Sequence, residues 1–177
     1  AGRVGYYAIQ WAVMAGAEVI STASNSSDRD LCLALGAKAV VNHREENWGQ
    51  QVLVATSGKK VDRVIDVEFG ANLPQILGCI APNGVIATYS STQVKTPSLP
   101  FLDMMYMDLT LRMVIVYAMP ESAKQAAIAA ISIALEQEQL EHRVAHVVPL
   151  EKISKAHELI EIGGFGGCVV VSMESSE

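Results

Sequence analysis

The sequence predicts an α/β domain built on a doubly wound parallel sheet. Short segments rich in valine and isoleucine alternate with longer segments whose apolar residues recur at helical spacing, and glycines close several of the helical segments. Each unit is therefore a strand, a crossover helix and a second strand, which requires parallel pairing. Right-handed crossovers then place helices on both faces of the sheet.

The first half of the chain carries four expected helices and four expected strands. Apolar residues at positions 8, 9, 12 and 13 give the first helix its periodicity, and Gly16 ends it. Ser26 and Ser27 are expected to cap the second helix, which stops at Gly36. The expected order is helix 5–15, strand 17–22, helix 26–35, strand 38–42, helix 46–56, strand 61–67, helix 71–80, a turn at 82–84 and strand 85–89.

The second half changes in character. Residues 90–100 contain several hydroxyl side chains and two prolines, so we expect a long loop. Residues 109–117 are almost entirely apolar and predict a further strand. A long helix from Pro120 to about residue 138, a strand around 144–148, a helix from 149 to 162 and a closing strand 168–173 complete the prediction.

Composition excludes several classes of protein. The chain has 177 residues, half of them hydrophobic and 18% charged, as in a globular domain. Its net charge of −6, without any basic run, argues against nucleic acid as the main partner. The apolar stretches are too short to cross a membrane, and no secretion signal is visible. Cys32, Cys79 and Cys168 suit neither a disulfide framework nor a metal motif, so we expect reduced thiols in a cytoplasmic protein.

A glycine turn opens the first helix. Gly2 and Gly5 flank Arg3 and Val4, and a strand with the spacing of a dinucleotide fold follows the helix. Glycines at such a turn let the backbone approach a pyrophosphate, whose charge is favourable at a helix N-terminus. A Gly-x-x-Gly pair is equally compatible with a simple turn and helix cap, so its context decides between the two interpretations.

Motifs along almost the whole chain resemble one family. Residues 1–12 (AGRVGYYAIQWA) are followed by LGA at 35–37, VIDV at 64–67, PNGVI at 82–86, PLEKI at 149–153 and GCVVV at 167–171. In this order they resemble the zinc-independent quinone oxidoreductases, or zeta-crystallin relatives, of the medium-chain dehydrogenase/reductase superfamily. The resemblance implies hydride transfer from NADPH to a quinone or conjugated carbonyl (enone).

The same resemblance implies a domain organisation. Residues 1–138 would form a Rossmann dinucleotide-binding domain without its first strand, and residues 139–177 a segment that returns to a catalytic domain. That strand and that domain are not in this sequence, so we expect a parent protein about twice as long. A nucleotide-binding module without turnover is the alternative. A methyltransferase is less well supported, because the second strand ends without an acidic residue for the ligand ribose.

The end of the second expected strand favours NADP(H) over NAD(H). NAD enzymes usually place a carboxylate there, whereas residues 22–25 read TASN. Ser24 and Asn25 can donate to a 2′-phosphate. The usual family lysine falls on Asp28, with Arg29 beside it, and the usual tyrosine falls on His43. We expect Arg29 to supply the charge and His43 or Arg44 to supply a donor, although Arg29 is equally compatible with a solvated helix charge.

Residues at the ends of two later strands are further candidates. Tyr89, Ser90 and Ser91 follow the strand 85–89, and ligands of open α/β sheets bind beyond the carboxyl ends of strands. By resemblance they lie along the ribose and nicotinamide, and Val67 lies near the adenine side. The alternative is an ordinary strand-to-loop exit whose hydroxyls satisfy backbone groups.

No residue of the sequence is assigned to catalysis or to a metal. His142 and His146 are four apart, but they fall on an expected strand, where four residues span about 13 Å. The expected partners are therefore a small quinone or enone substrate and a second copy of the chain. The apolar strand 109–117 would join two copies antiparallel across a twofold axis, unless it is a covered strand in a monomer.

Overall fold

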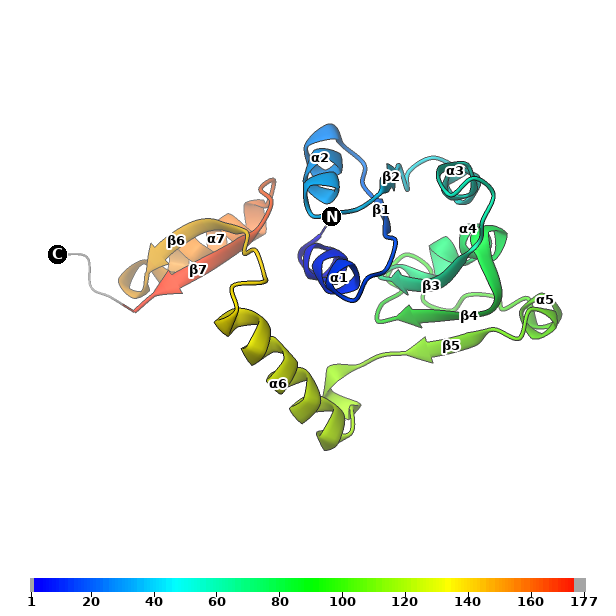
Figure 1. Cartoon of the computed structure of the whole chain (residues 1–177). Coiled ribbons are helices and arrows are strands. Elements are labelled where there is room, and N and C mark those ends of the chain that lie inside the picture. The colour runs from blue at the N-terminus through cyan, green and yellow to red at the C-terminus, as the bar shows by residue number, and fades with distance from the viewer. Residues whose placement is uncertain (1, 174–177) are drawn as a thin grey trace.

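The computed structural model describes residues 2–173, so the outer ends of the two expected ranges, residue 1 and residues 174–177, lie outside the described residues. Strands and helices alternate along the chain (Figure 1). The elements are α1 (Arg3–Met14), β1 (Ile20–Thr22), α2 (Ser26–Ala34), β2 (Ala39–Val41), α3 (Trp48–Ala55), β3 (Val61–Asp66), α4 (Phe69–Cys79), β4 (Ile80–Thr88), α5 (Phe101–Tyr106), β5 (Thr110–Met113), η1 (Val116–Ala118), α6 (Glu121–Glu136), β6 (Val144–Pro149), η2 (Leu150–Lys152), α7 (Ile153–Ile162) and β7 (Cys168–Ser172).

All strand pairs are parallel, which confirms the predicted α/β class. β1 pairs with β2, β4 lies between β3 and β5, and β6 pairs with β7. The strands of the described chain therefore fall into three sheets instead of one continuous sheet. No described strand lies between β1 and β3, so each of them has one edge without a strand partner there.

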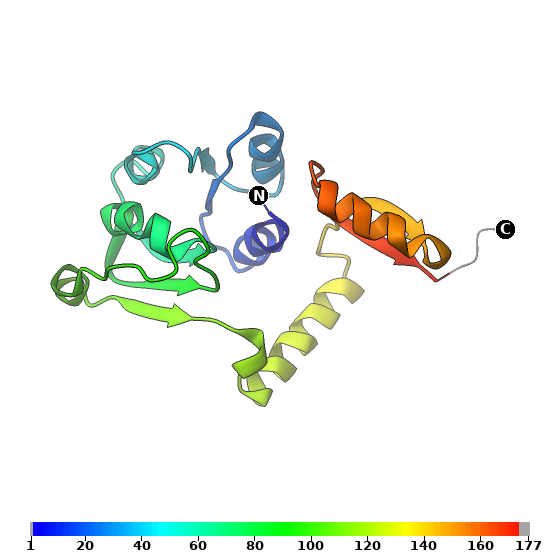
Figure 2. The same cartoon turned by 180° about the vertical axis from the view of Figure 1, so that it is seen from behind.

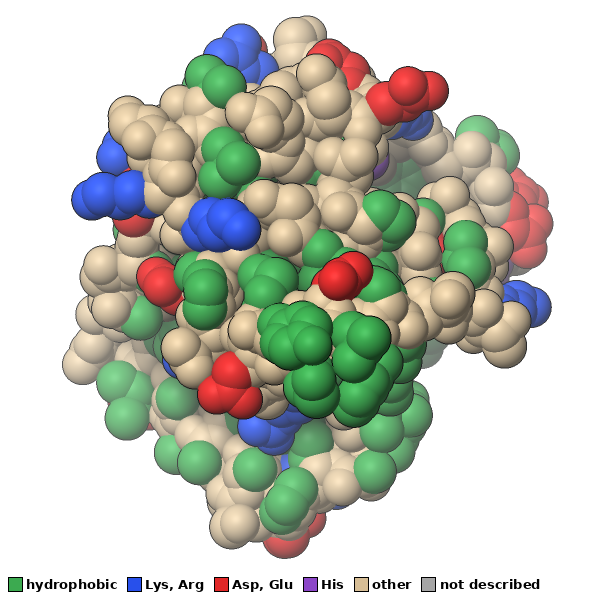
Figure 3. Space-filling view, turned by 90° about the vertical axis from the view of Figure 1, so that its right-hand side faces the viewer, with side chains coloured by type: hydrophobic (Ala, Val, Ile, Leu, Met, Phe, Trp, Pro, Cys, Tyr) green, Lys and Arg blue, Asp and Glu red, His purple; other side chains and the backbone are tan. Residues whose placement is uncertain are grey.

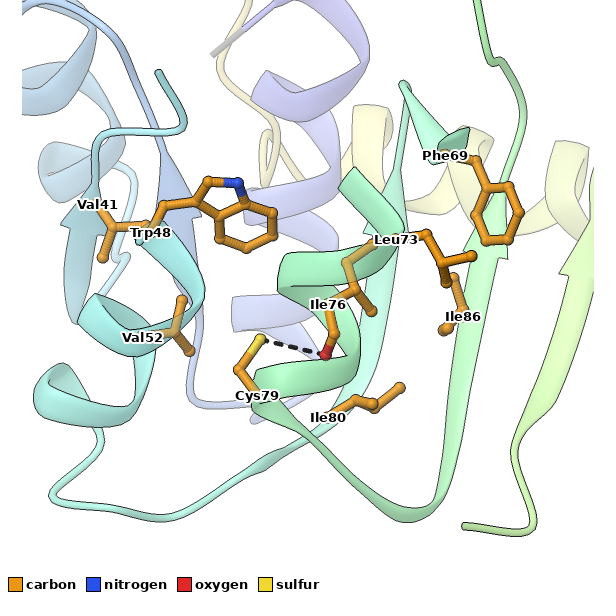
Figure 4. Packing of buried hydrophobic residues seen from close by; sticks show 9 residues of the cluster. All are labelled: Val41, Trp48, Val52, Phe69, Leu73, Ile76, Cys79, Ile80 and Ile86. Atoms are coloured by element: carbon orange, nitrogen blue, oxygen red, sulfur yellow. Dashed lines mark hydrogen bonds between the residues drawn. The ribbon is translucent and has the colours of Figure 1, made fainter. Parts of the chain in front are cut away.

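Two apolar clusters hold the first half together. The larger joins α3, α4 and β4, and its most deeply buried side chains, Ile76, Ile80 and Ile86, are completely inaccessible to water (Figure 4). The smaller packs α1 against α2 through Tyr6, Ile9 and Cys32. The apolar spacing that predicts these helices from the sequence thus corresponds to the faces buried in the two clusters.

Three predicted details were wrong. Asn25, not Ser26 or Ser27, caps α2, because its side-chain oxygen accepts from the Asp28 N–H at 2.8 Å. The predicted strand start at residue 85 was wrong, since β4 starts at Ile80, and the expected turn at 82–84 is an irregularity inside it: Val61 pairs with Ile80, Arg63 pairs with Val85, and Asn83 has a positive φ of 61°. The expected strand 109–117 is only four residues long as β5 and is followed by η1, and α5 was not predicted.

The C-terminal elements lie to one side of the body. Figures 1 and 2 show α6 leading away from β5 to the separate β6–α7–β7 unit. The segment between α6 and this unit meets α1, where the Glu141 N–H donates to Gln10 Oε1 at 2.7 Å and the Tyr7 hydroxyl lies 3.0 Å from His142 Nδ1. No helix in the described part of the chain combines the length and apolar character that a membrane span requires.

Candidate functional site

A cleft runs between β1 and β3, along the N-terminus of α1 and past the carboxyl ends of β1, β3 and β4. Sequence-predicted residues from five separate segments line it. They are Gly2, Arg3, Val4, Gly5, Ser24, Asn25, His43, Val67, Tyr89 and Ser90. Arg29 and Ser91 are not among the lining residues. The cleft therefore brings most of the candidates to one surface.

The N-terminus of α1 faces this cleft. Gly2 is the N-cap, with extended backbone and no side-chain cap, and the first intrahelical bond runs from the Tyr6 N–H to the Gly2 carbonyl at 2.9 Å. The N–H groups of the first helical turn have no acceptor within a helix, and no acidic residue lies in this turn. A Cβ added at Gly2 would meet nothing within 4 Å. The backbone there is open to an anionic group.

A charged group lies at the end of β1. Asp28 accepts from Asn25 Nδ2 at 2.8 Å, and Arg143 Nη1 lies 3.4 Å from Asp28 Oδ1. The hydrogen bond from Asn25 holds the pKa of Asp28 below its usual value, against partial burial, and Arg143 adds to this effect. The carboxylate, in the first turn of α2, is thus ionised and paired with a guanidinium.

Several cations line this cleft, namely Arg3, Arg44, Lys59, Lys60, Arg63 and Arg143, and of these Arg143 forms the ion pair with Asp28. Arg29, the cation expected from the sequence, is exposed and outside the cleft lining, whereas Arg143 lines it. Arg143 also packs on Gly166 and Gly167, where an added Cβ would collide with its guanidinium or its backbone. Arg143 and Asp28 are 115 residues apart, so no local sequence pattern indicates their contact.

His43 follows β2, whose end pairs with the end of β1, so it lies on the same side of the cleft as Ser24 and Asn25. Its ring is exposed, and its pKa is lowered by partial desolvation and then by the charge of Arg44. The lower pKa favours the neutral imidazole, which can donate from one nitrogen and accept at the other. His43 therefore contributes a polar group, not a fixed charge, to the cleft.

The carboxyl ends of β3 and β4 form the far end of the cleft. Asp66 is buried, and burial raises the pKa of its carboxyl, although hydrogen bonds from Asn72 Nδ2 at 2.7 Å and the Glu68 N–H at 3.0 Å oppose this. Tyr89 is 41% exposed, and its N–H donates to the Asp66 carbonyl. Ser91 does not reach the cleft, because its hydroxyl bonds the Gly70 N–H at 2.9 Å.

The histidines have separate contacts. His142 contacts Tyr7, and the ring of His146 packs edge-on against Phe165 with centroids 4.9 Å apart. Within residues 2–173, no three His, Cys, Asp or Glu side chains gather as metal ligands would. Cys32 and Cys79 are buried and Cys168 is partly buried, all as free thiols.

Comparison with known proteins agrees with this architecture. The family model described as zinc-binding dehydrogenase matches residues 4–132. A quinone oxidoreductase from Sus scrofa is 29% identical over 158 residues, which is 89% of this chain and 47% of that protein. The chain thus spans about half the length of the curated relatives it matches.

Solved structures give the same result. An NAD-dependent alcohol dehydrogenase superposes with a TM-score of 0.79 at 28% identity, over 98% of this chain and 49% of that one. A mycobacterial quinone oxidoreductase superposes with a TM-score of 0.85 at 25% identity, over 97% of this chain and 54% of that one. The predicted Rossmann-type fold is therefore confirmed. This chain belongs to the zinc-binding dehydrogenase family, the group of medium-chain dehydrogenases/reductases that includes the quinone oxidoreductases.

Proposed function

We propose that this chain is the nucleotide-binding part of an NADPH-dependent oxidoreductase that reduces a quinone or a conjugated carbonyl. The observation that carries the proposal is the open N-terminus of α1 in a cleft that also contains the carboxyl ends of β1, β3 and β4. Ligands of open α/β sheets bind at such a place. Quinone oxidoreductases among the relatives support the reaction class.

The residues of the cleft suit the parts of a dinucleotide. The N–H groups at the start of α1 would hold the pyrophosphate, and the open space beside Gly2 admits it. Ser24, Asn25 and His43 would meet the adenosine ribose, with Val67 on the adenine side. Tyr89 and Ser90 would lie along the nicotinamide ribose, with Ser91 fixing their loop. The nicotinamide, when bound, supplies the hydride, while the protein binds and orients both reactants.

The preference for NADPH over NADH is part of the proposal. Residues 22–25 carry no carboxylate, and the nearby Asp28 is paired with Arg143. A guanidinium is well suited to a phosphate, so Arg143 replaces Arg29 as the proposed partner of the 2′-phosphate. The NAD-dependent alcohol dehydrogenase among the structural relatives makes NADH the competing cofactor.

Titration with both cofactors tests this proposal. We expect the chain to bind NADPH more tightly than NADH, and Arg143→Ala to weaken NADPH binding by about tenfold or more while NADH changes little. Arg29→Ala is the matched control and should leave both affinities unchanged. Absence of binding to either cofactor would contradict the assignment, and equal losses for both would contradict the role of Arg143.

Turnover belongs to the longer protein that we propose. It would combine residues 1–138 as the nucleotide-binding domain with a strand that fills the part of the cleft between the edges of β1 and β3 and leaves the N-terminus of α1 and the carboxyl ends of the strands to the cofactor. Residues 139–177 would join a catalytic domain. NADPH oxidation by the full-length protein with quinones and enones tests the reaction, and metal analysis tests the zinc independence that the resemblance implies. Cofactor binding without any turnover would select the alternative, a nucleotide-binding module.

A homodimer through residues 109–117, which include β5, is also proposed. The outer edge of β5 has no described strand partner, and Met113, Ile115 and Tyr117 are 72%, 59% and 90% exposed. An exposed apolar edge invites pairing with a second copy. We expect a charge at Val114 or a proline at Ile115 to give folded monomers in sedimentation experiments. Monomeric wild-type protein at micromolar concentration would exclude this interface.

A further inference from the structure

The loop after β4 is attached to the start of α4 by one carboxylate. Glu68 directly precedes α4, and its Oε2 accepts from the Thr92 N–H at 3.1 Å and from the Thr92 hydroxyl at 2.5 Å. Its Oε1 accepts from the Gln93 N–H at 2.8 Å. One side chain thus binds three donors of a loop 24 residues further along the chain. We call Glu68, Thr92 and Gln93 together the Glu68 clamp.

The same loop occupies the N-terminus of α4. The Phe69 N–H donates to the Ser90 carbonyl at 3.1 Å, and the Gly70 N–H donates to Ser91 Oγ. A Cβ added at Gly70 would collide with the Val94 carbonyl oxygen, so the loop packs directly on the helix backbone. The two helix N-termini differ: that of α1 is open to the cleft, whereas that of α4 is already occupied by residues 90–94.

A buried carboxyl group fixes the turn that presents Glu68. Asp66 accepts from the Glu68 N–H and from Asn72 Nδ2, on the first turn of α4. Its carbonyl accepts from the Tyr89 N–H at 3.3 Å. The end of β3, the start of α4 and the loop after β4 are therefore one connected hydrogen-bonded unit. Asp66, Glu68, Ser90 and Thr92 from this unit also line the cleft.

We propose that Glu68 is a positioning residue for the nicotinamide end of the cofactor. It binds no part of the ligand; it acts through Thr92 and Gln93, whose attachment holds Tyr89 and Ser90 against the cleft. This inference rests on the proposed function, because residues 89–91 are assigned there to the nicotinamide ribose. The Glu68 carboxylate, which lies outside the predicted site, keeps this half of the cleft ordered before the ligand arrives.

Amide hydrogen exchange of the ligand-free chain tests the clamp itself. In Glu68→Ala, amides of residues 89–94 should exchange about tenfold faster, while those of the buried half of α4 keep their wild-type rates. Glu68→Gln retains one acceptor oxygen, so its exchange rates at residues 89–94 should lie between those of the wild type and Glu68→Ala. Thr92→Val removes only the hydroxyl donor to Glu68. It provides a second test of the clamp if the glutamate variants misfold. Unchanged exchange of residues 89–94 in Glu68→Ala would overturn the clamp.

Binding to two probes separates positioning from a general structural role. NADPH contains the nicotinamide half, whereas adenosine 2′,5′-bisphosphate contains only the adenine half. Glu68→Ala should weaken NADPH binding about tenfold and leave the bisphosphate unchanged, and Glu68→Gln should restore part of the loss. Equal losses for both probes, or no loss for NADPH, would overturn the positioning role. If the wild-type chain binds neither probe, the proposed function fails, and hydrogen exchange still decides whether Glu68 orders the loop.

Discussion

Residues 3–113 and residues 114–173 both consist of helices and parallel strands, but the first region buries far more of its side chains than the second. The first region contains both apolar clusters and all of the completely buried side chains. In the second, only Ala134, Val148 and Ala156 are buried among the described residues. On α6, Ile128, Ile131 and Ile133 are between 44% and 55% exposed, although the helix is rich in apolar residues.

The difference shows that helical periodicity does not by itself indicate burial. An apolar helix face has to pack against another element, and large exposed apolar patches on a protein are typically contact sites. Figure 3 shows hydrophobic side chains gathered on the face of the molecule that forms the right-hand side of Figure 1, where α5 lies. Phe101 and Tyr106 of α5 are 70% and 79% exposed. Stability of the isolated chain should therefore come from residues 3–113.

The largest expected effect on stability comes from a cavity in the core. Ile76→Ala should lower the free energy of unfolding by about 2–5 kcal/mol, because Ile76 is completely buried and a cavity would remain. Ile128→Ala on α6 is the matched control and should change it by less than about 0.5 kcal/mol. Chemical denaturation measures both. Similar losses for the two variants would mean that the regions share one packed core.

The contact between α3 and α4 provides a second test within the core. Gly49→Ala should cost about 1–3 kcal/mol, because the new Cβ would lie 2.5 Å from the Gln75 carbonyl oxygen. Gly78→Ala, in the same packed pair of helices, meets nothing within 4 Å and should stabilise the chain by about 0.5–1 kcal/mol. Thermal unfolding of the pair should show shifts of opposite sign.

A substitution at the junction between the two regions should have a smaller effect on the free energy of unfolding. The buried Gln10 amide donates to the Glu141 carbonyl at 3.3 Å and accepts from the Glu141 N–H. Gln10→Ala should cost about 1 kcal/mol in unfolding free energy, since one hydrogen-bonded side chain is lost. Amides of residues 139–142 should exchange faster, while those of β3 and β4 remain protected. Faster exchange throughout α1 and α2 would show that the junction supports the core.

The smallest expected effect depends on pH. Because the folded-state pKa of Asp28 is depressed, its stabilisation is present above the unfolded pKa of about 4 and is lost as the pH falls through the lower folded value. The pair with Arg143 is about 30% exposed, so the effect should be below about 1 kcal/mol. Asp28→Asn should flatten the dependence of stability on pH between about 5 and 3. An unchanged slope would contradict this role.

Local patterns predicted the fold well, and distant contacts were not predictable. The valine-rich strands, the helix after Gly2 and the strand-end site follow from residues close together in sequence. Arg143 beside Asp28 and Glu68 beside Thr92 join segments that no periodicity relates. Asn25 lines the cleft as expected, and its side-chain oxygen also caps α2, because a side chain directly before a helix is within reach of its first N–H groups. The apolar content of residues 109–117 did not indicate that β5 ends at Met113, and α5 (Phe101–Tyr106), which buries no side chain, lies in the stretch before it.

The separation of the sheets at β1 and β3 has a consequence for folding order. Ile20 pairs with Ala39, Arg63 with Val85 and Val85 with Thr110, so every pairing in these sheets joins residues 19 to 25 positions apart. Pairings this local close small loops at modest entropic cost. The strand pairing within each of the two sheets therefore does not depend on the other sheet, and the sheets are linked through the apolar cluster that contains Val41 of β2 and Ile86 of β4. A strand that joined them would add hydrogen-bonded coupling to this packing, and each sheet would then gain protection from the other's stability.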